Sequence, residues 1–131
     1  KKKIQDVLKN GIHIHCPEGG VQKDGPSAGT AITIAILSLI LGKKVRRTVA
    51  MTGEIDLHAN ITAIGGLQEK IFGAIRAGAK TVIYPDANQI DFDTIKSTYA
   101  TDQGTVLAEM ESIEFIPVSK LQNVVDIIFE K

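Results

Sequence analysis

The feature that most constrains the fold is an apolar run of fourteen residues, "AGTAITIAILSLIL", at 28–41. Its interruptions are Gly29, Thr30, Thr33 and Ser38. The run is too short and too polar to be a membrane span, so we expect no membrane association. Because apolar residues occupy almost every side of it, it predicts a helix over 27–41 at the centre of the core, ending at Gly42.

Short strand and helix patterns alternate along the rest of the chain. Helices are predicted at 1–9, 67–78, 91–99, 103–110 and 119–130, and strands at 12–15, 48–52, 55–57, 61–64, 81–84 and 113–116. At 131 residues the chain is long enough for one domain with a real core. The alternation indicates an α/β (α+β) fold, with a mixed sheet and packed helices.

The charge balance narrows the classes of partner. Fifteen basic residues match fifteen acidic ones, so no net field favours nucleic acid or an anionic membrane. There are four Phe, two Tyr and no Trp, which leaves few platforms for stacking bases. Cys16 is the single cysteine and cannot form an internal disulfide, so a reducing compartment is expected.

The stretch "KDGPSAG" at 23–29 allows two interpretations of its serine. Ser27 could be a helix N-cap, since it precedes an apolar run. Alternatively it could present a nucleophilic hydroxyl, because Gly25 and Pro26 make a tight turn just before it. A helix N-terminus also favours the negative charge that develops in acyl transfer. The sequence around Ser27 leaves both interpretations open.

A nucleophilic serine needs a base, and several candidates exist. His13 and His15 alternate along a predicted strand and would share one face, while His58 and Asp24 lie elsewhere. Neither HExxH nor CxxC occurs, so a metal site is not expected.

Lys70 is the remaining candidate base. It falls on the same predicted helical face as Leu67, Ile71 and Ala74. A lysine in an apolar stripe either extends its amine to water or is desolvated. Desolvation favours the neutral amine, which can act as a general base near neutral pH.

Four blocks together resemble the proteolytic domain of Lon proteases. They are "HIHCPEGG", "KDGPSAGT", "MTGEI" and "AIGGLQEK", and the similarity continues through "GAKTVIYPDAN" to the end of the chain. The resemblance implies the Lon proteolytic-domain fold. It also implies a serine endopeptidase with a Ser-Lys dyad, in which Ser27 is the nucleophile and Lys70 the general base. Thr52 would bond the lysine.

The resemblance assigns supporting positions to a further group of residues. They are Asp24, Gly25 and Pro26 in the serine block, His13 and His15 near the site but outside the dyad, and Glu18 in the same loop.

The resemblance also implies a larger assembly. The chain has no GxxxxGK[ST], so no ATP or other cofactor is expected in it, and ATP and Mg would belong to an AAA+ ATPase domain upstream. We therefore expect one domain over 1–131, a fragment that lacks the opening of the proteolytic domain. The whole protein would be a homo-hexamer that degrades unfolded or damaged proteins in the cytoplasm, or in the mitochondrial matrix of a eukaryote. The isolated fragment would be a weak or inactive peptidase.

Two other functions remain open at this point. Relatives of the fold serve as assembly or DNA-binding modules that lack the dyad, so a non-catalytic module is the main alternative. A Ser-His hydrolase is the other, and it would require His13 or His15.

Overall fold

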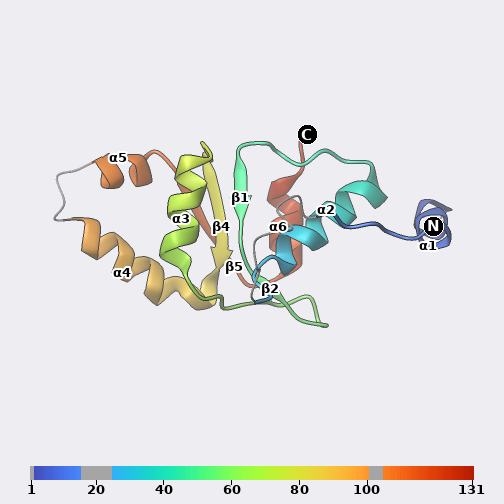
Figure 1. The fold of residues 1–131 in the computed structure, drawn as a ribbon, viewed down its shortest axis with the longest axis horizontal. Coiled ribbons are helices and arrows are strands. Elements are labelled where there is room, and N and C mark those ends of the chain that lie inside the picture. The colour runs from blue at the N-terminus through green and yellow to red at the C-terminus, as the bar shows by residue number, and fades with distance from the viewer. Residues whose placement is uncertain (1, 16–24, 101–104) are drawn as a thin grey trace.

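The computed structural model describes residues 2–15, 25–100 and 105–131. A parallel sheet of three strands lies at its centre, in the order β1-β4-β5 (Figure 1). Its strands are β1 (Val49–Met51), β4 (Thr81–Pro85) and β5 (Glu114–Val118). A separate antiparallel pair is formed by β2 (Glu54–Ile55) and β3 (Ile61–Thr62). The predicted α/β class with both kinds of strand pairing is confirmed.

Helices cover both faces of the sheet, as parallel strands require. They are α1 (Lys2–Asn10), α2 (Gly29–Leu41), α3 (Leu67–Arg76), α4 (Gln89–Ala100), α5 (Thr105–Glu111) and α6 (Leu121–Ile128), with a 3-10 turn at Asp86–Asn88. In Figure 1, α3, α4 and α5 lie on one side of β4, and α2 and α6 lie on the other. Each predicted helix therefore has a counterpart near its expected position.

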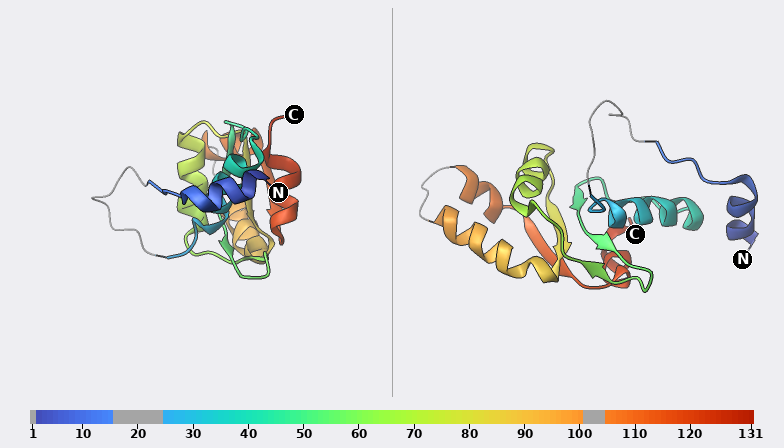
Figure 2. Two further views of the ribbon diagram at one scale, coloured as in Figure 1. Left: turned by 90° about the vertical axis from the view of Figure 1, so that its right-hand side faces the viewer. Right: turned by 60° about the horizontal axis from the view of Figure 1, so that its bottom comes forward.

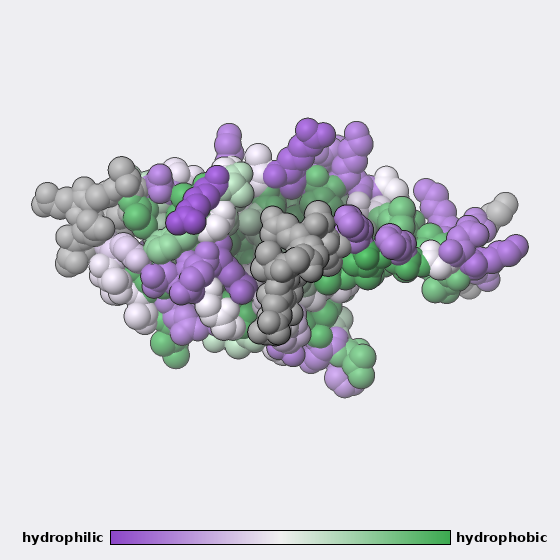
Figure 3. Space-filling model, in the orientation of Figure 1, coloured by the Kyte–Doolittle hydropathy of each residue, from purple (hydrophilic) through white to green (hydrophobic). Residues whose placement is uncertain are grey.

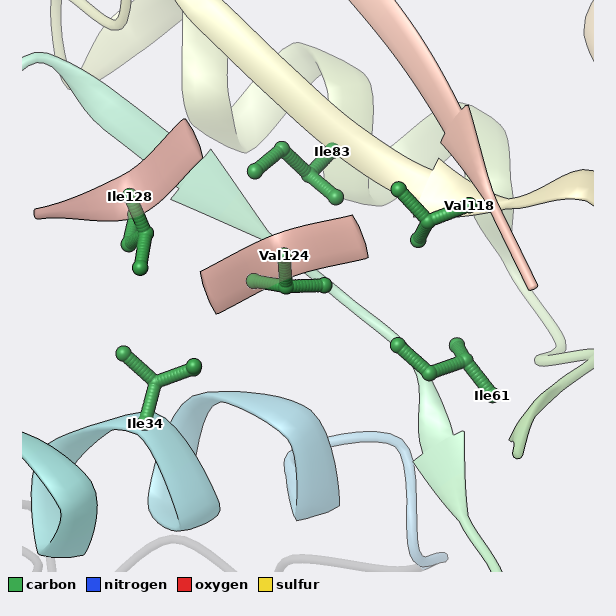
Figure 4. Packing of buried hydrophobic residues seen from close by; sticks show 6 residues of the cluster. All are labelled: Ile34, Ile61, Ile83, Val118, Val124 and Ile128. Atoms are coloured by element: carbon green, nitrogen blue, oxygen red, sulfur yellow. The ribbon is translucent and has the colours of Figure 1, made fainter. Parts of the chain in front are cut away.

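The central strand β4 supplies both halves of the core because alternate side chains point to opposite faces. Ile83 packs with Ile34, Val118 and Val124 in the cluster drawn in Figure 4. Tyr84, the next residue, packs in a second cluster with Leu67, Ile71, Phe92, Ile95 and Met110. Strand β4 is buried along its whole length, which explains its continuous apolar sequence.

The two-stranded pair ends in a hairpin that its own polar groups hold closed. The Asp56 carboxylate accepts hydrogen bonds from the backbone N–H of His58 and Asn60, at 2.8 and 2.9 Å, and from the Asn60 side chain at 3.0 Å. The bond from the Asn60 side chain is the main reason that the pKa of Asp56 lies below its ordinary value. Leu57, at the tip, is fully exposed.

Two expectations about the first third of the chain are wrong. Residues 11–15 form no strand in the described structure, and Ile12 and Ile14 are exposed. Helix α2 is not central either, because Thr30 and Ile34 are its buried residues while Ile32, Leu39 and Leu41 are exposed. Figure 2 shows α1 at one end of the molecule beyond α2, and Figure 3 shows an apolar patch in this region. An apolar helix is central only when neighbours cover all its sides, and the described neighbours of α2 leave these three side chains exposed.

Of the helices that the structure describes, none is long and apolar enough to cross a membrane.

Candidate active site

Ser27 lies in the turn that leads into α2 and does not cap this helix. The Gly29 N–H donates to the Pro26 carbonyl at 3.0 Å, which closes the turn around Ser27. The N-cap residue is Ala28, and no side-chain bond caps the helix. The structure therefore does not support the N-cap interpretation of Ser27, and its half-buried side chain is available for another role.

Backbone hydrogen bonds tie this turn to the end of β1. The Gly53 N–H donates to the Ser27 carbonyl at 3.0 Å, and the Thr52 hydroxyl approaches the same carbonyl oxygen at 3.4 Å. In return the N–H and hydroxyl of Thr30 donate to the Gly53 carbonyl, at 3.0 and 2.9 Å. The serine is thus fixed to the sheet by bonds in both directions.

Gly53 is required at the centre of this contact. A Cβ atom added there would lie 2.6 Å from Thr30 Oγ1 and 2.7 Å from Ile61 Cγ2. Both neighbours are buried and cannot move away freely. The close approach of β1 to the start of α2 therefore depends on the absence of a side chain at this position.

Lys70 lies on α3 at the edge of that helix's apolar stripe. Leu67, Ile71 and Ala74 are buried, the first two as members of the second cluster, and Lys70 is half-buried beside them. Gly66, in a left-handed conformation with φ of 68°, precedes the helix, and its carbonyl accepts the Lys70 N–H at 3.2 Å. The Lys70 side chain is therefore neither fully buried, as a desolvated amine would require, nor fully exposed, as an amine extended into water would be.

Ser27 and Lys70 line the same hollow, of about 400 Å³. Thr52 also lines it, and most of its wall is apolar, from Ala31, Ala50, Met51, Leu67, Ile71, Ala74 and Val82. A second hollow, of about 300 Å³, is lined by both Ser27 and Lys70 and by Gly25, Pro26, Glu54, Ala63, Ile64 and Gly65. The two side chains therefore lie where a larger apolar hollow adjoins a smaller and more polar one.

A hydroxyl and an amine in a shared hollow are the groups that acyl transfer needs. Two N–H groups near the start of α2 are already in use, since Gly29 donates to Pro26 and Thr30 donates to Gly53. They cannot stabilise an oxyanion without giving up those bonds. The expectation that the N-terminus of α2 favours a developing negative charge therefore does not extend to these two N–H groups.

Comparison with known proteins identifies the family. The model of the Lon protease (S16) C-terminal proteolytic domain matches residues 2–131. The chain belongs to the Lon protease family. It is 40% identical over 126 residues to the Lon protease of Elusimicrobium minutum, covering 96% of this chain and 14% of the relative.

Two further relatives give the same result. The Lon protease of Fusobacterium nucleatum is 56% identical over 94 residues, which are 71% of this chain and 12% of the relative. That of Orientia tsutsugamushi is 45% identical over 125 residues, which are 95% and 15%. The chain spans about a seventh of the length of these Lon proteases, so it is compared with their proteolytic domain alone.

The Lon resemblance placed two histidines near the site, and the structure places them along α2. His13 and His15 are exposed and line a separate hollow, of about 370 Å³, with Ile12, Ile14, Ala31, Ile32, Ala35, Ile36 and Leu39. This hollow shares Ala31 with the one that contains Ser27. We expected a strand at 12–15 to hold the two histidines on one face of a sheet, but the structure forms no strand there.

Other residues of the Lon motifs divide between described and undescribed parts. Gly25, with φ of 88°, and Pro26 form the turn before Ser27. Asp24 and Glu18 lie outside the described residues. Within the described ranges, no three His, Cys, Asp or Glu side chains gather closely enough to hold a metal ion.

Sequence reasoning missed Asn88, which is buried beside this site. Its side chain bonds the backbone of Ile64, one of the residues that line the smaller hollow. The available signal was weak: an asparagine after "YPDA", with Asp91 three positions further on. Neither residue, from its type or its place in the sequence, predicts a contact with a segment 24 positions away.

Proposed function

We propose that this domain is a serine endopeptidase in which Ser27 is the nucleophile and Lys70 the general base. The observation that carries the proposal is that both side chains line the same two adjoining hollows. Membership of the Lon proteolytic-domain family supports peptide-bond hydrolysis as the reaction. The balanced charge of the chain offers no comparable support for a nucleic-acid-binding module.

In the proposed reaction the neutral Lys70 amine accepts the proton of the Ser27 hydroxyl as Oγ bonds the carbonyl carbon of the substrate. The leaving amine takes that proton from Lys70 as the peptide bond breaks, which leaves an ester on Ser27. A water molecule then attacks the ester carbon while Lys70 accepts one of its protons. The bond between that carbon and Ser27 Oγ breaks, Lys70 returns the proton to Oγ, and the acid product leaves.

The apolar hollow supplies a place for a substrate side chain. Alanines, a methionine and branched aliphatic residues form its wall, so an apolar residue next to the cleaved bond would lose contact with water there. Such a residue is buried in folded proteins and accessible in unfolded ones. Unfolded or damaged polypeptides are accordingly the proposed substrates.

The proposal for the whole protein extends this domain with the parts expected from the resemblance. An AAA+ ATPase domain, using ATP and Mg, would deliver unfolded chain to Ser27, and six copies would form a ring in the cytoplasm or the mitochondrial matrix. This domain would contribute the hydrolysis and no nucleotide site.

The test is Ser27→Ala in the full-length protein. Cleavage of an unfolded protein should fall by at least about a thousandfold, because the nucleophile is gone. The thermal midpoint should be almost unchanged, because Ser27 makes no capping bond. Ser38→Ala, at the other end of α2, is the matched control: it removes a hydroxyl that bonds the Lys43 carbonyl and should leave cleavage intact.

Labelling with a fluorophosphonate probe separates the enzyme from its alternatives. The unmodified protein and Ser38→Ala should be labelled at one serine, and Ser27→Ala should not. Retained cleavage in Ser27→Ala would end the proposal. A protein that folds and assembles but neither cleaves nor reacts with the probe would be a non-catalytic module.

A further inference from the structure

Asn88 is a buried residue whose side-chain amide bonds the backbone of another segment, as the backbone of a paired strand would. It is 2% exposed and lies at the end of the 3-10 turn Asp86–Asn88, just beyond β4. Its Oδ1 accepts the Ile64 N–H at 2.9 Å, and its Nδ2 donates to the Ile64 carbonyl at 2.9 Å. One side chain thus satisfies both backbone groups of a residue 24 positions away.

Asp91 determines which way this amide faces. Its Oδ2 accepts the Asn88 Nδ2 at 2.7 Å. A carboxylate can only accept, so the Nδ2 atom must lie on the side shared by Asp91 and the Ile64 carbonyl. Oδ1 is then left for the Ile64 N–H. The contact has one orientation, and a bond to an ionised partner strengthens it.

The segment that Asn88 holds leads directly to the candidate base. Ile64 is followed by Gly65, Gly66 and then α3, which carries Lys70. Gly65 is exposed with nothing near it, and Gly66 has a positive φ, so this link has little stiffness of its own. Burial of Leu67 sets the depth of the helix, but apolar contacts are not directional. The bonds from Asn88 are directional.

The held segment is also a wall of the site. Ile64 and Gly65 line the hollow that contains Ser27, Lys70 and Glu54. On the far side of the same segment, Asp91 lines a neighbouring hollow with Gly65, Gly66 and Glu69. A shift of Ile64 would therefore move the start of α3 and change the space in front of Ser27 together.

We propose that Asn88, oriented by Asp91, is a positioning residue for Lys70. It fixes Ile64, and through the Gly65-Gly66 link it fixes where α3 places the amine relative to Ser27. This rests on the proposed role of Lys70 as the base. Asn88 itself touches neither the substrate nor the reacting atoms.

The experiment compares Asn88→Ala with Val124→Ala in the full-length protein, by the rate of acylation with a fluorophosphonate probe between pH 6 and pH 10. Val124 is fully buried in the other core cluster, so its truncation lowers stability without touching Ile64. Both variants are measured at the same number of degrees below their own unfolding midpoints.

Asn88→Ala should acylate about ten to a hundred times more slowly at neutral pH, the scale expected when a catalytic group is misplaced by a fraction of an ångström to an ångström. The loss should be of similar size from pH 6 to pH 10, because it arises from the position of the amine relative to Ser27. Val124→Ala should keep the original rate and pH dependence. Equal losses in the two variants, or an unchanged Asn88→Ala, would overturn the proposal.

A second pair of variants keeps the test valid should Asn88→Ala fail to fold. Asp91 is exposed, so Asp91→Ala should fold and show the same loss of acylation rate to a smaller extent. Asn88→Asp should be slower still, since it faces Asp91 and the Ile64 carbonyl with a negative charge. Adding Asp91→Asn to it should restore part of the rate, and no restoration would contradict the proposed orientation.

Variants of Lys70 distinguish failure of the proposed dyad from failure of the positioning role alone. An active Lys70→Arg variant would remove the proposed base, and the role of Asn88 with it. An inactive Lys70→Arg together with an unaffected Asn88→Ala would leave the dyad in place and refute the positioning role alone.

Discussion

The two halves of the candidate site are held in different ways. Ser27 is fixed by its own backbone, through bonds between the turn before α2 and the Thr52-Gly53 end of β1. Lys70 is carried on a helix whose start follows a flexible glycine pair, and a distant side chain, Asn88, holds that approach. One half depends on the absence of a side chain at Gly53, and the other on the presence of one at Asn88.

The two halves of the site should therefore tolerate different kinds of substitution. Backbone bonds survive most substitutions, so the serine half should fail only where a new atom will not fit. The lysine half should respond in graded fashion to polar substitutions some distance from the amine. Variants on the two sides test this contrast.

After Ser27→Ala, the largest effect is expected at Lys70. Lys70→Arg should reduce acylation by at least about a hundredfold, because a guanidinium does not lose its proton in a protein and general-base assistance disappears. Lys70→Met should be equally slow but at least as stable, since it removes a charged group from the edge of an apolar stripe. The measurement is the acylation rate against pH. An arginine variant with normal activity would place the base elsewhere.

The next largest effect is a steric one on the serine side. Gly53→Ala should lower the free energy of unfolding by about 1–3 kcal/mol, as overpacking does in rigid surroundings, because the new methyl meets Thr30 and Ile61. It should also separate β1 from the start of α2 and slow acylation. Denaturant unfolding and probe labelling measure the two effects.

Gly65→Ala is the matched control on the lysine side. A Cβ at Gly65 meets nothing within 4 Å, and its φ is not positive. The free energy of unfolding of Gly65→Ala should stay close to that of the unmodified protein. If both alanine variants unfold alike, the proposed distinction between the two halves fails.

A smaller effect with the opposite sign is expected at Gly73, within α3. Gly73→Ala should stabilise the domain by about 0.5–1 kcal/mol, because alanine favours a helix interior and no atom lies within 4 Å of the new Cβ. Gly73 lines the apolar hollow, so the methyl should occupy part of it. The kcat/KM should fall for peptides with a large apolar residue at the cleaved bond and stay level for those with alanine there.

The smallest effect is expected at the histidines. His13→Gln and His15→Gln should change acylation by about twofold or less, since exposed side chains outside the site alter free energies by about 0.5 kcal/mol or less. Probe labelling at saturating and limiting concentration measures this. A loss as complete as that of Ser27→Ala would make a histidine the base and favour a Ser-His hydrolase.

Local patterns predicted the elements well because their causes are local. The helix predicted to end at Gly42 does so, with φ of 63°, and the strands predicted on either side of residues 58–60 pair with each other. The face of α3 formed by Leu67, Ile71 and Ala74 is buried, as helical spacing predicts. Ser27, Thr52 and Lys70, which the family motifs named, line one hollow, but the Thr52 hydroxyl donates to the Ser27 carbonyl in place of the predicted bond to Lys70.

The features that the sequence did not predict depend on contacts between distant segments. Residues 12–15 alternate as a strand does, but a strand needs a partner to pair with, and the described residues offer none. Composition suggested that α2 is buried, but burial depends on which neighbours surround a helix. The contact between Asn88 and Ile64 joins two segments far apart in the sequence, and neither segment carries a pattern that predicts contact with the other.

The exposed apolar side chains of α2 affect how the isolated domain behaves in solution. Ile32 and Leu39 line one hollow together with exposed Ile12 and Ile14, Leu41 is exposed as well, and the sequence has a formal net charge of zero at pH 7. Copies of the domain therefore meet without electrostatic repulsion at the pH where its chemistry would be assayed. Self-association should be strongest near neutrality and should weaken as the buffer moves away from it in either direction. Light scattering across that range should pass through a maximum close to pH 7.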